Sequence, residues 1–230
     1  AKLAQQFPGM SILPVASADL KPSDLVVWAV KPQTFKDAAL AAGPFLGNAL
    51  HLSVAAGITS ESMAGWLQTQ RIVRAMPNTP ALVGLGMTGL FAREGASAAD
   101  RALVEAVVKT TGDLVWVASE EQLDAVTALS GSGPAYVFYF LEAMRDAGTR
   151  MGLPPEVAYQ LAVGTFIGAS TLAQRSDDPP QTLRERVTSK GGTTYAALTS
   201  MEAAGVKAKF EEALFAAQKR AEELGQEFGR

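Results

Sequence analysis

The stretch Asp24-Leu-Val-Val-Trp-Ala-Val30 decides how this chain folds. From Leu25 on it is a continuous apolar run with β-branched residues, and Lys31-Pro32 follows it directly. Such a run is typical of a strand that is buried on both faces, as in a parallel sheet covered by helices. A stretch with helical character follows, from Thr34 to about Ala42. The first prediction is therefore an α/β fold.

The alternation of strands and helices continues to about residue 117. Further β-rich runs lie at residues 51–56, 71–76, 87–91 and 114–117, and helical segments are expected near residues 60–67 and 98–110. Strands and helices that alternate through short loops favour a mostly parallel sheet with helices packed on it.

From Glu120 onward the β-rich runs disappear. Ala, Leu, Glu and Met dominate, and Gly and Pro fall where helices are expected to end, at residues 130–134, 152–155, 177–180, 190–192 and 205. This pattern indicates a helical domain of five or six helices. We place the boundary near residue 118, which gives an α/β domain over residues 1–117 and an all-α domain over residues 118–230.

The composition excludes several classes of protein. The chain has 230 residues, a net charge of −3, no cysteine and a single histidine, His51. This set of side chains offers neither a zinc site nor a Ser–His or Cys–His pair, so we expect no metal. We also expect no nucleic-acid partner, because basic tracts are absent, and no membrane span, which needs about 20 mostly apolar residues. A cysteine-free chain fits a cytoplasmic protein.

The ends of three predicted strands carry candidate cofactor residues. They are Val30, Lys31 and Pro32 at the end of the first strand, Ala55 and Ala56 at the end of the second, and Asn78 after the third. In a doubly wound sheet, ligands bind beyond the carboxyl ends of the strands. Each group alone is more often ordinary turn chemistry. Three groups at successive strand ends predict a cofactor cleft.

The segment Gly84-Leu-Gly-Met-Thr-Gly89 matches the G-x-G-x-x-G fingerprint of dinucleotide-binding loops. That fingerprint needs a strand before the glycines and a helix after them. Here a proline-containing loop precedes the glycines and a strand-like segment follows. We therefore reject this segment as a phosphate-binding loop.

A second glycine-containing segment, Thr188-Ser-Lys-Gly-Gly-Thr-Thr194, lies between two predicted amphipathic helices. Adjacent glycines allow successive N–H groups to turn toward a common point, and the next helix begins at the threonines. Main-chain amides at a helix N-terminus suit a small anion such as a carboxylate. The alternative is a plain helix–helix turn with a threonine N-cap.

The helix expected over residues 155–174 contains Gly164 and Gly168 on one face. Each glycine costs a soluble helix roughly 1 kcal/mol relative to alanine, so such a pair indicates that another helix crosses closely. Tight packing within the chain and a helical dimer interface are both open explanations.

Three segments together resemble the pyrroline-5-carboxylate reductase family. They are Arg74-Ala-Met-Pro-Asn-Thr-Pro80, Leu129-Ser-Gly-Ser-Gly-Pro-Ala-Tyr136 and Val187-Thr-Ser-Lys-Gly-Gly-Thr-Thr194. The resemblance implies a Rossmann domain followed by a helical domain that forms homodimers, often assembled into larger homo-oligomers. It implies an oxidoreductase that reduces 1-pyrroline-5-carboxylate to L-proline, the last step of proline biosynthesis, with NADPH or NADH as cofactor.

The resemblance also implies roles for single residues. The strand-end residues named above would border the cofactor. Main-chain amides of the loop would hold the substrate carboxylate, through Ser189, Gly191, Gly192, Thr193 and Thr194. The Thr194 hydroxyl would reach the ring nitrogen, which makes it the catalytic candidate. Glu120 matches an acidic position near the substrate in some members, and Arg186 stands where some members carry asparagine.

Family members begin with a strand and a glycine-rich loop that cradles the cofactor phosphates. We expect this βα element, roughly 30–50 residues long, to lie upstream of Ala1, so that residues 1–117 form an incomplete domain. Two alternatives stay open. One is a related two-domain dehydrogenase for hydroxyacids or another imine, for which Lys190 is the nearest candidate for a catalytic lysine, although its place inside the glycine loop favours a scaffold role. The other is a non-catalytic dimerisation module, if Ala1 is the true start.

Overall fold

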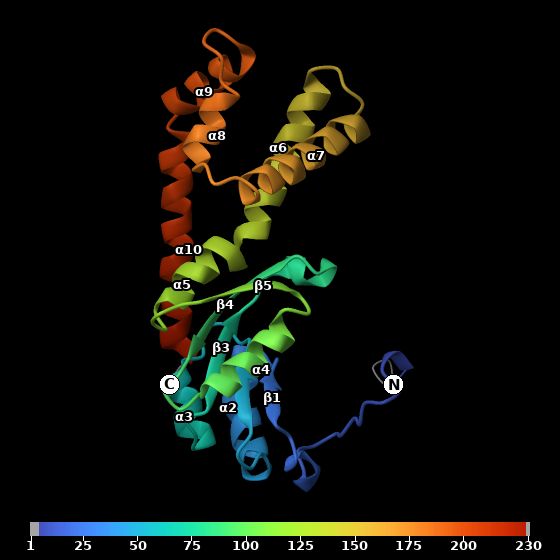
Figure 1. The fold of residues 1–230 in the computed structure, drawn as a ribbon, viewed down its shortest axis with the longest axis vertical. Helices are drawn as coiled ribbons and strands as arrows, with labels where there is room; N and C mark the ends of the chain where they lie inside the picture. The colour runs from blue at the N-terminus through green and yellow to red at the C-terminus, as the bar shows by residue number, and fades with distance from the viewer. Residues whose placement is uncertain (1–4, 229–230) are drawn as a thin grey trace. The chain divides into compact units, whose positions relative to one another are not determined.

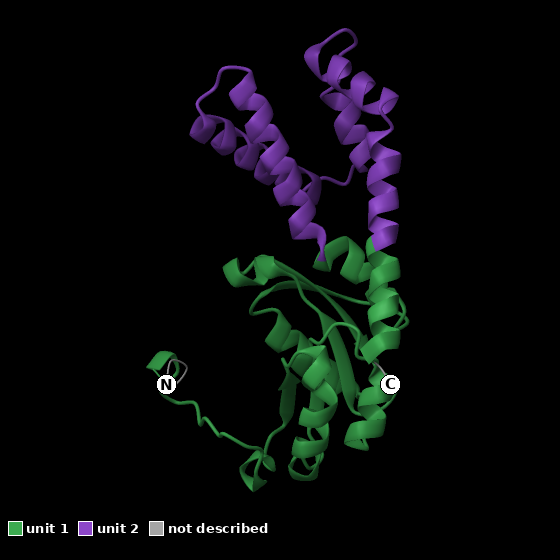
Figure 2. Cartoon of the chain, turned by 180° about the vertical axis from the view of Figure 1, so that it is seen from behind, with its two compact units in different colours: residues 1–131, 217–230 green, residues 132–216 purple. Residues whose placement is uncertain are grey.

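The computed structural model describes residues 5–228, which form two compact units (Figure 2). Unit 1 contains the residues up to Gly131 together with those from Ala217 on, and unit 2 contains Ser132–Ala216. This division differs from the predicted boundary near residue 118, because residues 118–131 pack with the sheet. The sequence also predicts that residues 1–7 are the end of a helix. Residues 1–4 lie outside the described residues, and Gln5 and Gln6 are helical.

Unit 1 is built on a five-stranded sheet (Figure 1). Its strands lie side by side in chain order: β1 (Leu25–Trp28), β2 (Leu50–Ser53), β3 (Ile72–Met76), β4 (Gly86–Ala92) and β5 (Gly112–Trp116). The pairs β1–β2, β2–β3 and β4–β5 are parallel, whereas β3–β4 is antiparallel. The prediction of an α/β fold with a mostly parallel sheet is confirmed.

The antiparallel pair has a local cause. β3 and β4 are joined by a short 3-10 helix, η3 (Thr79–Val83), and not by a crossover helix. Parallel neighbours need a crossover of a dozen or more residues, so a short connection returns the chain antiparallel.

Helices cover both faces of the sheet. They are α2 (Pro32–Ala42), α3 (Ser60–Leu67), α4 (Ala98–Val108) and α5 (Gln122–Val126), with short 3-10 turns η1 (Ala18–Leu20) and η2 (Gly43–Phe45). One core cluster joins α2 and α3 to the sheet through Phe35 and Met63. A second cluster joins α4 to the sheet through Val104. Two separate clusters of buried apolar side chains are what a sheet covered on both faces produces.

The glycines of residues 84–89 have structural roles in the turn before β4 and in the packing of that strand. Gly84 ends η3 with φ +73°, and Gly86 and Gly89 belong to β4, so a strand follows the glycines where the fingerprint requires a helix. A Cβ at Gly89 would lie 2.7 Å from Cγ1 of Val126, so this glycine allows α5 to pack on β4. The prediction that a strand follows these glycines is confirmed.

The helices that follow are α6 (Gly133–Arg150), α7 (Pro155–Gln174), α8 (Pro180–Arg186), α9 (Thr193–Ala203) and α10 (Val206–Phe228), preceded by a single π-helical turn, η4 (Thr127–Gly131). Helices α6 and α7 approach each other closely at Gly148. A Cβ at this glycine would lie 2.8 Å from Cβ of Ala158. The Phe210 ring on α10 lies 5.7 Å from Tyr136 and 5.8 Å from Phe140 on α6. Unit 2 thus has its own aromatic contacts.

Gly164 and Gly168 face open space. A Cβ on either glycine would meet no atom within 4 Å among the described residues. The opposite side of α7 is packed, with Ala158 and Ala162 buried. Tight packing against another helix of the same described chain therefore does not explain the pair. As a separate observation, none of the helices in residues 5–228 combines the length and apolarity needed to cross a membrane.

Candidate functional site

The carboxyl ends of β1, β2 and β3 meet at one edge of the sheet. The register pairs Trp28 with Ser53 and Ser53 with Arg74, and the Val54 N–H donates to the Trp28 carbonyl at 3.1 Å. All three strands run in the same direction. The structure thus brings the predicted cofactor residues to one edge of unit 1: Val30, Lys31, Pro32, Ala55, Ala56 and Asn78. We call this the strand-end edge.

Lys31 occupies the N-cap position of α2, and Pro32 is the first residue of that helix. The Lys31 side chain is exposed and forms no ion pair with any described residue. A helix N-terminus carries partial positive charge, and the ammonium group adds a full one. Together they make this part of the edge favourable for an anionic group.

The turn after β2 is made of small residues and packs against α10. Ala55 is buried, and its N–H donates to Ser53 Oγ at 3.2 Å. Gly57 has φ +76°, and a Cβ there would lie 3.1 Å from the carbonyl oxygen of Leu224 on α10. A side chain at Gly57 is therefore disfavoured twice, by its backbone conformation and by the last turns of α10.

Asn78 uses its side-chain amide within unit 1. Its Oδ1 accepts from the Met87 N–H at 2.9 Å, and its Nδ2 donates to Ser130 Oγ at 3.1 Å and to the Ser130 carbonyl at 3.3 Å. Asn78 therefore holds the loop after β3 against β4 and η4. Sequence reasoning expected a residue close to the cofactor and did not foresee these contacts.

Glu120 lies in a cluster of polar side chains on unit 1. Its Oε1 accepts from the Ser60 N–H at 2.6 Å and from Arg74 Nη1 at 2.7 Å, and its Oε2 accepts from the Ser60 hydroxyl. Ser60 is the first residue of α3. The carboxylate thus stabilises the helix N-terminus and neutralises a nearly buried guanidinium.

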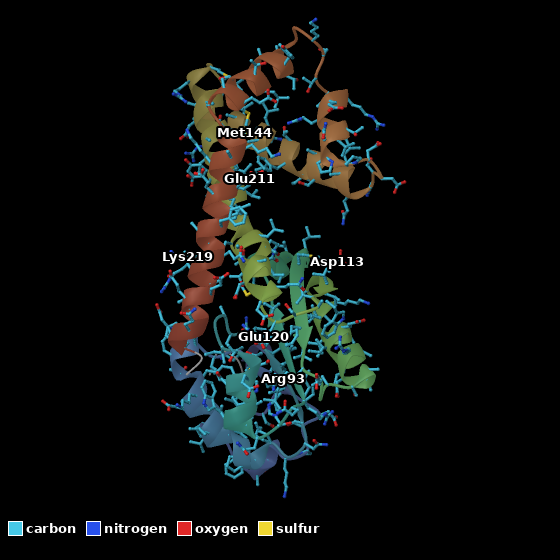
Figure 3. The ribbon with its side chains drawn as sticks, turned by 90° about the vertical axis from the view of Figure 1, so that its left-hand side faces the viewer. Arg93, Asp113, Glu120, Met144, Glu211 and Lys219 are labelled. Carbon is cyan, nitrogen blue, oxygen red and sulfur yellow. The ribbon has the colours of Figure 1, made fainter. Side chains whose placement is uncertain are left out.

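Arg93 extends this cluster. Its Nη1 donates to Ser60 Oγ at 3.1 Å and its Nη2 donates to Glu61 Oε2 at 2.7 Å. Side chains of Arg93 and Glu120 help to line an open pocket of about 610 Å³ in unit 1, and Figure 3 labels both. The cluster joins residues 60, 74, 93 and 120, whose separation along the chain left no sequence signal for it.

The predicted substrate loop forms a single tight turn in unit 2. Gly191 has φ +77°, and the Gly192 N–H donates to the Ser189 carbonyl at 2.9 Å. Gly192 is the N-cap of α9 and provides no side-chain cap. The threonine N-cap that was the plain alternative is therefore not present, because both threonines lie inside the helix.

The start of α9 leaves main-chain donors free. The first helical bond runs from the Ala196 N–H to the Gly192 carbonyl at 3.1 Å. The N–H groups of Thr193, Thr194 and Tyr195 come before it, and such groups have no partner within their own helix. A Cβ at Gly192 would lie 2.6 Å from Ser189 Oγ and 3.1 Å from the Ser189 carbonyl oxygen, so the turn is tight at this position. The turn has the geometry of an anion-binding site.

Two cations near this loop have different surroundings. Arg186, at the end of α8, forms an ion pair with Asp178. Lys190 is exposed within the turn.

As for metals, residues 5–228 contain no group of three or more His, Cys, Asp or Glu side chains that could hold an ion.

The residues expected to form one site thus fall into two sets. The strand-end residues and Glu120 belong to unit 1, whereas residues 189–194 belong to unit 2. Each set is assembled locally by its own unit. The fold combines a mostly parallel sheet, open strand ends that can bind a ligand, and a helical region that follows the sheet. This combination is typical of the class of two-domain, dinucleotide-dependent oxidoreductases.

Known proteins narrow this class. A family described as pyrroline-5-carboxylate reductase dimerisation matches residues 120–224. The chain is 42% identical over 232 residues to the pyrroline-5-carboxylate reductase of Pseudomonas aeruginosa. This alignment covers 100% of this chain and 85% of that protein.

Solved structures agree. A pyrroline-5-carboxylate reductase from Coxiella burnetii has a TM-score of 0.84 and 40% identity, over 89% of this chain and 77% of that one. The Plasmodium falciparum enzyme, solved with NADP bound, has a TM-score of 0.84 and 30% identity, over 94% of this chain and 81% of that one. The chain belongs to the pyrroline-5-carboxylate reductase family. The predicted combination of a Rossmann-like sheet and a helical dimerisation domain is confirmed.

Proposed function

We propose that the protein reduces 1-pyrroline-5-carboxylate to L-proline with NADPH or NADH, the last step of proline biosynthesis. The observation that carries this proposal is the 42% identity to a named reductase over 100% of the chain. The alternatives of a hydroxyacid dehydrogenase and of a non-catalytic module have no comparable support.

The strand-end edge is the proposed binding site of the cofactor. Its fit rests on three local features: the exposed ammonium of Lys31 at the start of α2, the buried Ala55 followed by the small Ala56, and a backbone at Gly57 that disfavours a side chain. The first suits a phosphate or ribose, and the others let a flat ring approach the main chain. When bound, NADPH or NADH supplies the hydride for the imine carbon.

The turn of residues 189–194 is the proposed seat of the substrate. The free N–H groups at the start of α9 bind its carboxylate, and the Thr194 hydroxyl hydrogen-bonds to the ring nitrogen. These contacts hold the cyclic imine in one orientation, and fixed orientation is a large part of the rate enhancement of such reactions. Glu120 remains a predicted acidic group on the substrate side, with its carboxylate also bonded to Ser60 and Arg74.

The test is a direct assay of the full-length protein. Addition of 1-pyrroline-5-carboxylate should cause loss of NADPH or NADH absorbance and formation of L-proline. A 3-hydroxyacid with the oxidised cofactor serves as the control and should give no turnover. Turnover of the hydroxyacid, with none of the imine, would overturn the proposed substrate.

The dimerisation domain indicates that the protein forms homo-oligomers. We propose a homodimer made through the helical region, residues 118–230, with further assembly of dimers left as a prediction. The support is the outward face of α7, where Leu161 and Leu172 are 56% and 59% exposed on either side of Gly164 and Gly168. A face of glycines flanked by leucines lets a second helix approach closely.

Native mass by light scattering tests the homodimer. We expect twice the mass of one chain or an even multiple of it, and a monomer at all concentrations would contradict the proposal. A cytoplasmic location remains a prediction from the cysteine-free composition, and fractionation of cells with an antibody to the protein would test it.

A further inference from the structure

An exposed apolar segment of unit 1 has no role in the function proposed above. Between Ala75 and Ala92 the chain carries no charged residue. At the centre of this stretch, Leu82, Val83 and Leu85 are 89%, 74% and 77% exposed. Contiguous apolar surface of this kind is rare on a monomer and marks an interaction site.

The segment is an ordered protrusion. The Gly84 N–H donates to the Ala81 carbonyl at 3.1 Å, and the Leu85 N–H donates to the Pro80 carbonyl at 3.1 Å. β4 is also longer than its neighbour: Met76, the last residue of β3, pairs with Gly89, so residues 86–88 extend past the end of β3 (Figure 1). The fold therefore presents these apolar side chains at a defined place beyond the strand-end edge.

The protrusion is continuous with the dimerisation region. Asn78 and Met87 flank the protrusion, and both hydrogen-bond to Ser130. Asn78 Nδ2 donates to the Ser130 hydroxyl at 3.1 Å, and the Ser130 hydroxyl donates to the Met87 carbonyl at 3.3 Å. Ser130 lies within residues 120–224, which match the dimerisation family. The adjacent Leu129 is 69% exposed. Exposed apolar surface thus passes from the protrusion into the dimerisation region.

We propose that Leu82, Val83 and Leu85 belong to the homodimer interface and pack against the helical unit of a second copy of the chain. The inference rests on the proposed homodimer and adds a segment of the nucleotide-binding domain to it. A second copy is the favoured partner because unit 2 displays matching apolar side chains: Phe138, Tyr139 and Ile167 are 59%, 70% and 63% exposed. Interface cores are depleted of charge, as this segment is.

The proposal has a consequence for the reaction. Asn78 lies at the base of the protrusion and among the residues predicted to border the cofactor. A second copy that buries the protrusion would therefore fix the conformation of the loop after β3. The strand-end edge of one subunit would depend on its partner.

Photo-crosslinking tests the identity of the partner. The photoreactive residue benzoylphenylalanine replaces Leu82 in a mixture of light and ¹⁵N-labelled subunits, combined by reversible unfolding. We expect covalent dimers in which light peptides are joined to heavy ones, with the attachment points on helices of unit 2. The matched control carries the same residue at Leu40, which is 52% exposed on α2, and should give no dimers.

Other outcomes are equally decisive. Crosslinks only within one chain would assign the protrusion to the chain's own helical unit and overturn the proposal. Absence of crosslinks in a protein of dimeric native mass would overturn it as well, while leaving the homodimer itself intact. A monomeric native mass would overturn the homodimer and this inference together.

A second measurement avoids the photochemistry. The double variant Leu82→Asp/Leu85→Asp places two charges on the protrusion without disturbing the interior of the chain, because both side chains are exposed. We expect the dissociation constant of the dimer to rise roughly tenfold or more, since burial of unpaired charge is unfavourable. Leu40→Asp should leave it unchanged. Equal constants for the double variant and the wild type would overturn the proposal.

Discussion

Among single residues, Thr194 is the one whose predicted role is easiest to isolate. It lies inside α9, and its hydroxyl is not needed as an N-cap, because Gly192 holds that position. Thr194→Ala should therefore keep the turn and lose one or two hydrogen bonds to the substrate. We expect kcat/KM for imine reduction to fall roughly 10- to 100-fold.

Steady-state kinetics with 1-pyrroline-5-carboxylate as the varied substrate measures this effect. Thr110→Ala is a suitable control, since among residues 5–228 its hydroxyl bonds only to the Val107 carbonyl at the end of α4. An unchanged kcat/KM in Thr194→Ala would remove this residue from the site.

His51 makes stability depend on pH. Its side chain is buried in β2, where Nδ1 accepts from Trp28 Nε1 at 3.0 Å. Burial, and secondarily the charge of Arg71, lowers the pKa of His51 to about 4. The unfolded chain therefore binds a proton at a higher pH than the folded one, and stability falls as the pH drops from about 6.5 toward 4. Between pH 8 and 5 we expect a loss of about 2 kcal/mol.

Urea titrations at the two pH values measure this difference. Asp100 does not contribute, because hydrogen bonds from Arg71 lower its pKa to about 2 and it stays ionised in this range. His51→Gln removes the titrating group and should show a much smaller pH dependence. A free energy of unfolding that falls equally in both proteins would contradict the assignment to His51.

Among the elements, helix bounds followed closely from the sequence. The predicted ranges 60–67 and 155–174 are those of α3 and α7. Capping residues explain this: Thr59 Oγ1 accepts from the Ser62 N–H, and Pro155 opens α7. The direction of β4 was not predictable in the same way, because hydrophobic pattern identifies a strand without its orientation. Only the shortness of the η3 connection carried that information.

The candidate site was predictable to a similar degree. The strand-end residues follow from the strands themselves, since parallel strands end at a common edge. The Ser60–Arg74–Glu120 cluster joins segments far apart in sequence, and no local pattern encodes such contacts. The free amides at the start of α9 were expected from the glycine pair, although the N-cap is Gly192 and not a threonine.

Helix α7 provides a prediction about assembly. The double variant Gly164→Leu/Gly168→Leu fills space that is open within the chain and, in our proposal, occupied by a partner helix. Overpacking of a close contact costs roughly 1–3 kcal/mol. We therefore expect the dimer dissociation constant to rise about tenfold or more, measured by analytical ultracentrifugation.

Gly65→Leu is the matched control for that variant. Gly65 lies within α3, and a Cβ there also meets nothing within 4 Å among the described residues. This substitution should raise helix stability slightly and leave the dissociation constant unchanged. If the α7 variant dimerises as tightly as the wild type, that face of α7 is not the interface.

At the scale of the whole molecule, folding and assembly should be coupled. Helix α10 contributes to both units, and unit 2 leaves many apolar side chains exposed, so a single chain buries little of them. Dimer formation then adds stability by mass action. A hundredfold dilution should lower the stability of the dimer by about 2.7 kcal/mol.

This dependence is measured as the shift of the urea midpoint with protein concentration, followed by far-UV circular dichroism. The α7 double variant should show a smaller shift over the same range. A wild-type midpoint that is independent of concentration would indicate that the subunits fold without help from each other.

The uncharged stretch from Ala75 to Ala92 has a practical consequence. Arg74 and Arg93 bracket it, and no lysine or arginine lies between them. Trypsin therefore releases Asn78, the protrusion and β4 as one peptide. In a protein footprinting experiment, the extent of labelling of this one peptide would report both the binding of the nicotinamide cofactor and the association of the second subunit. The time course of labelling would show which of the two events comes first.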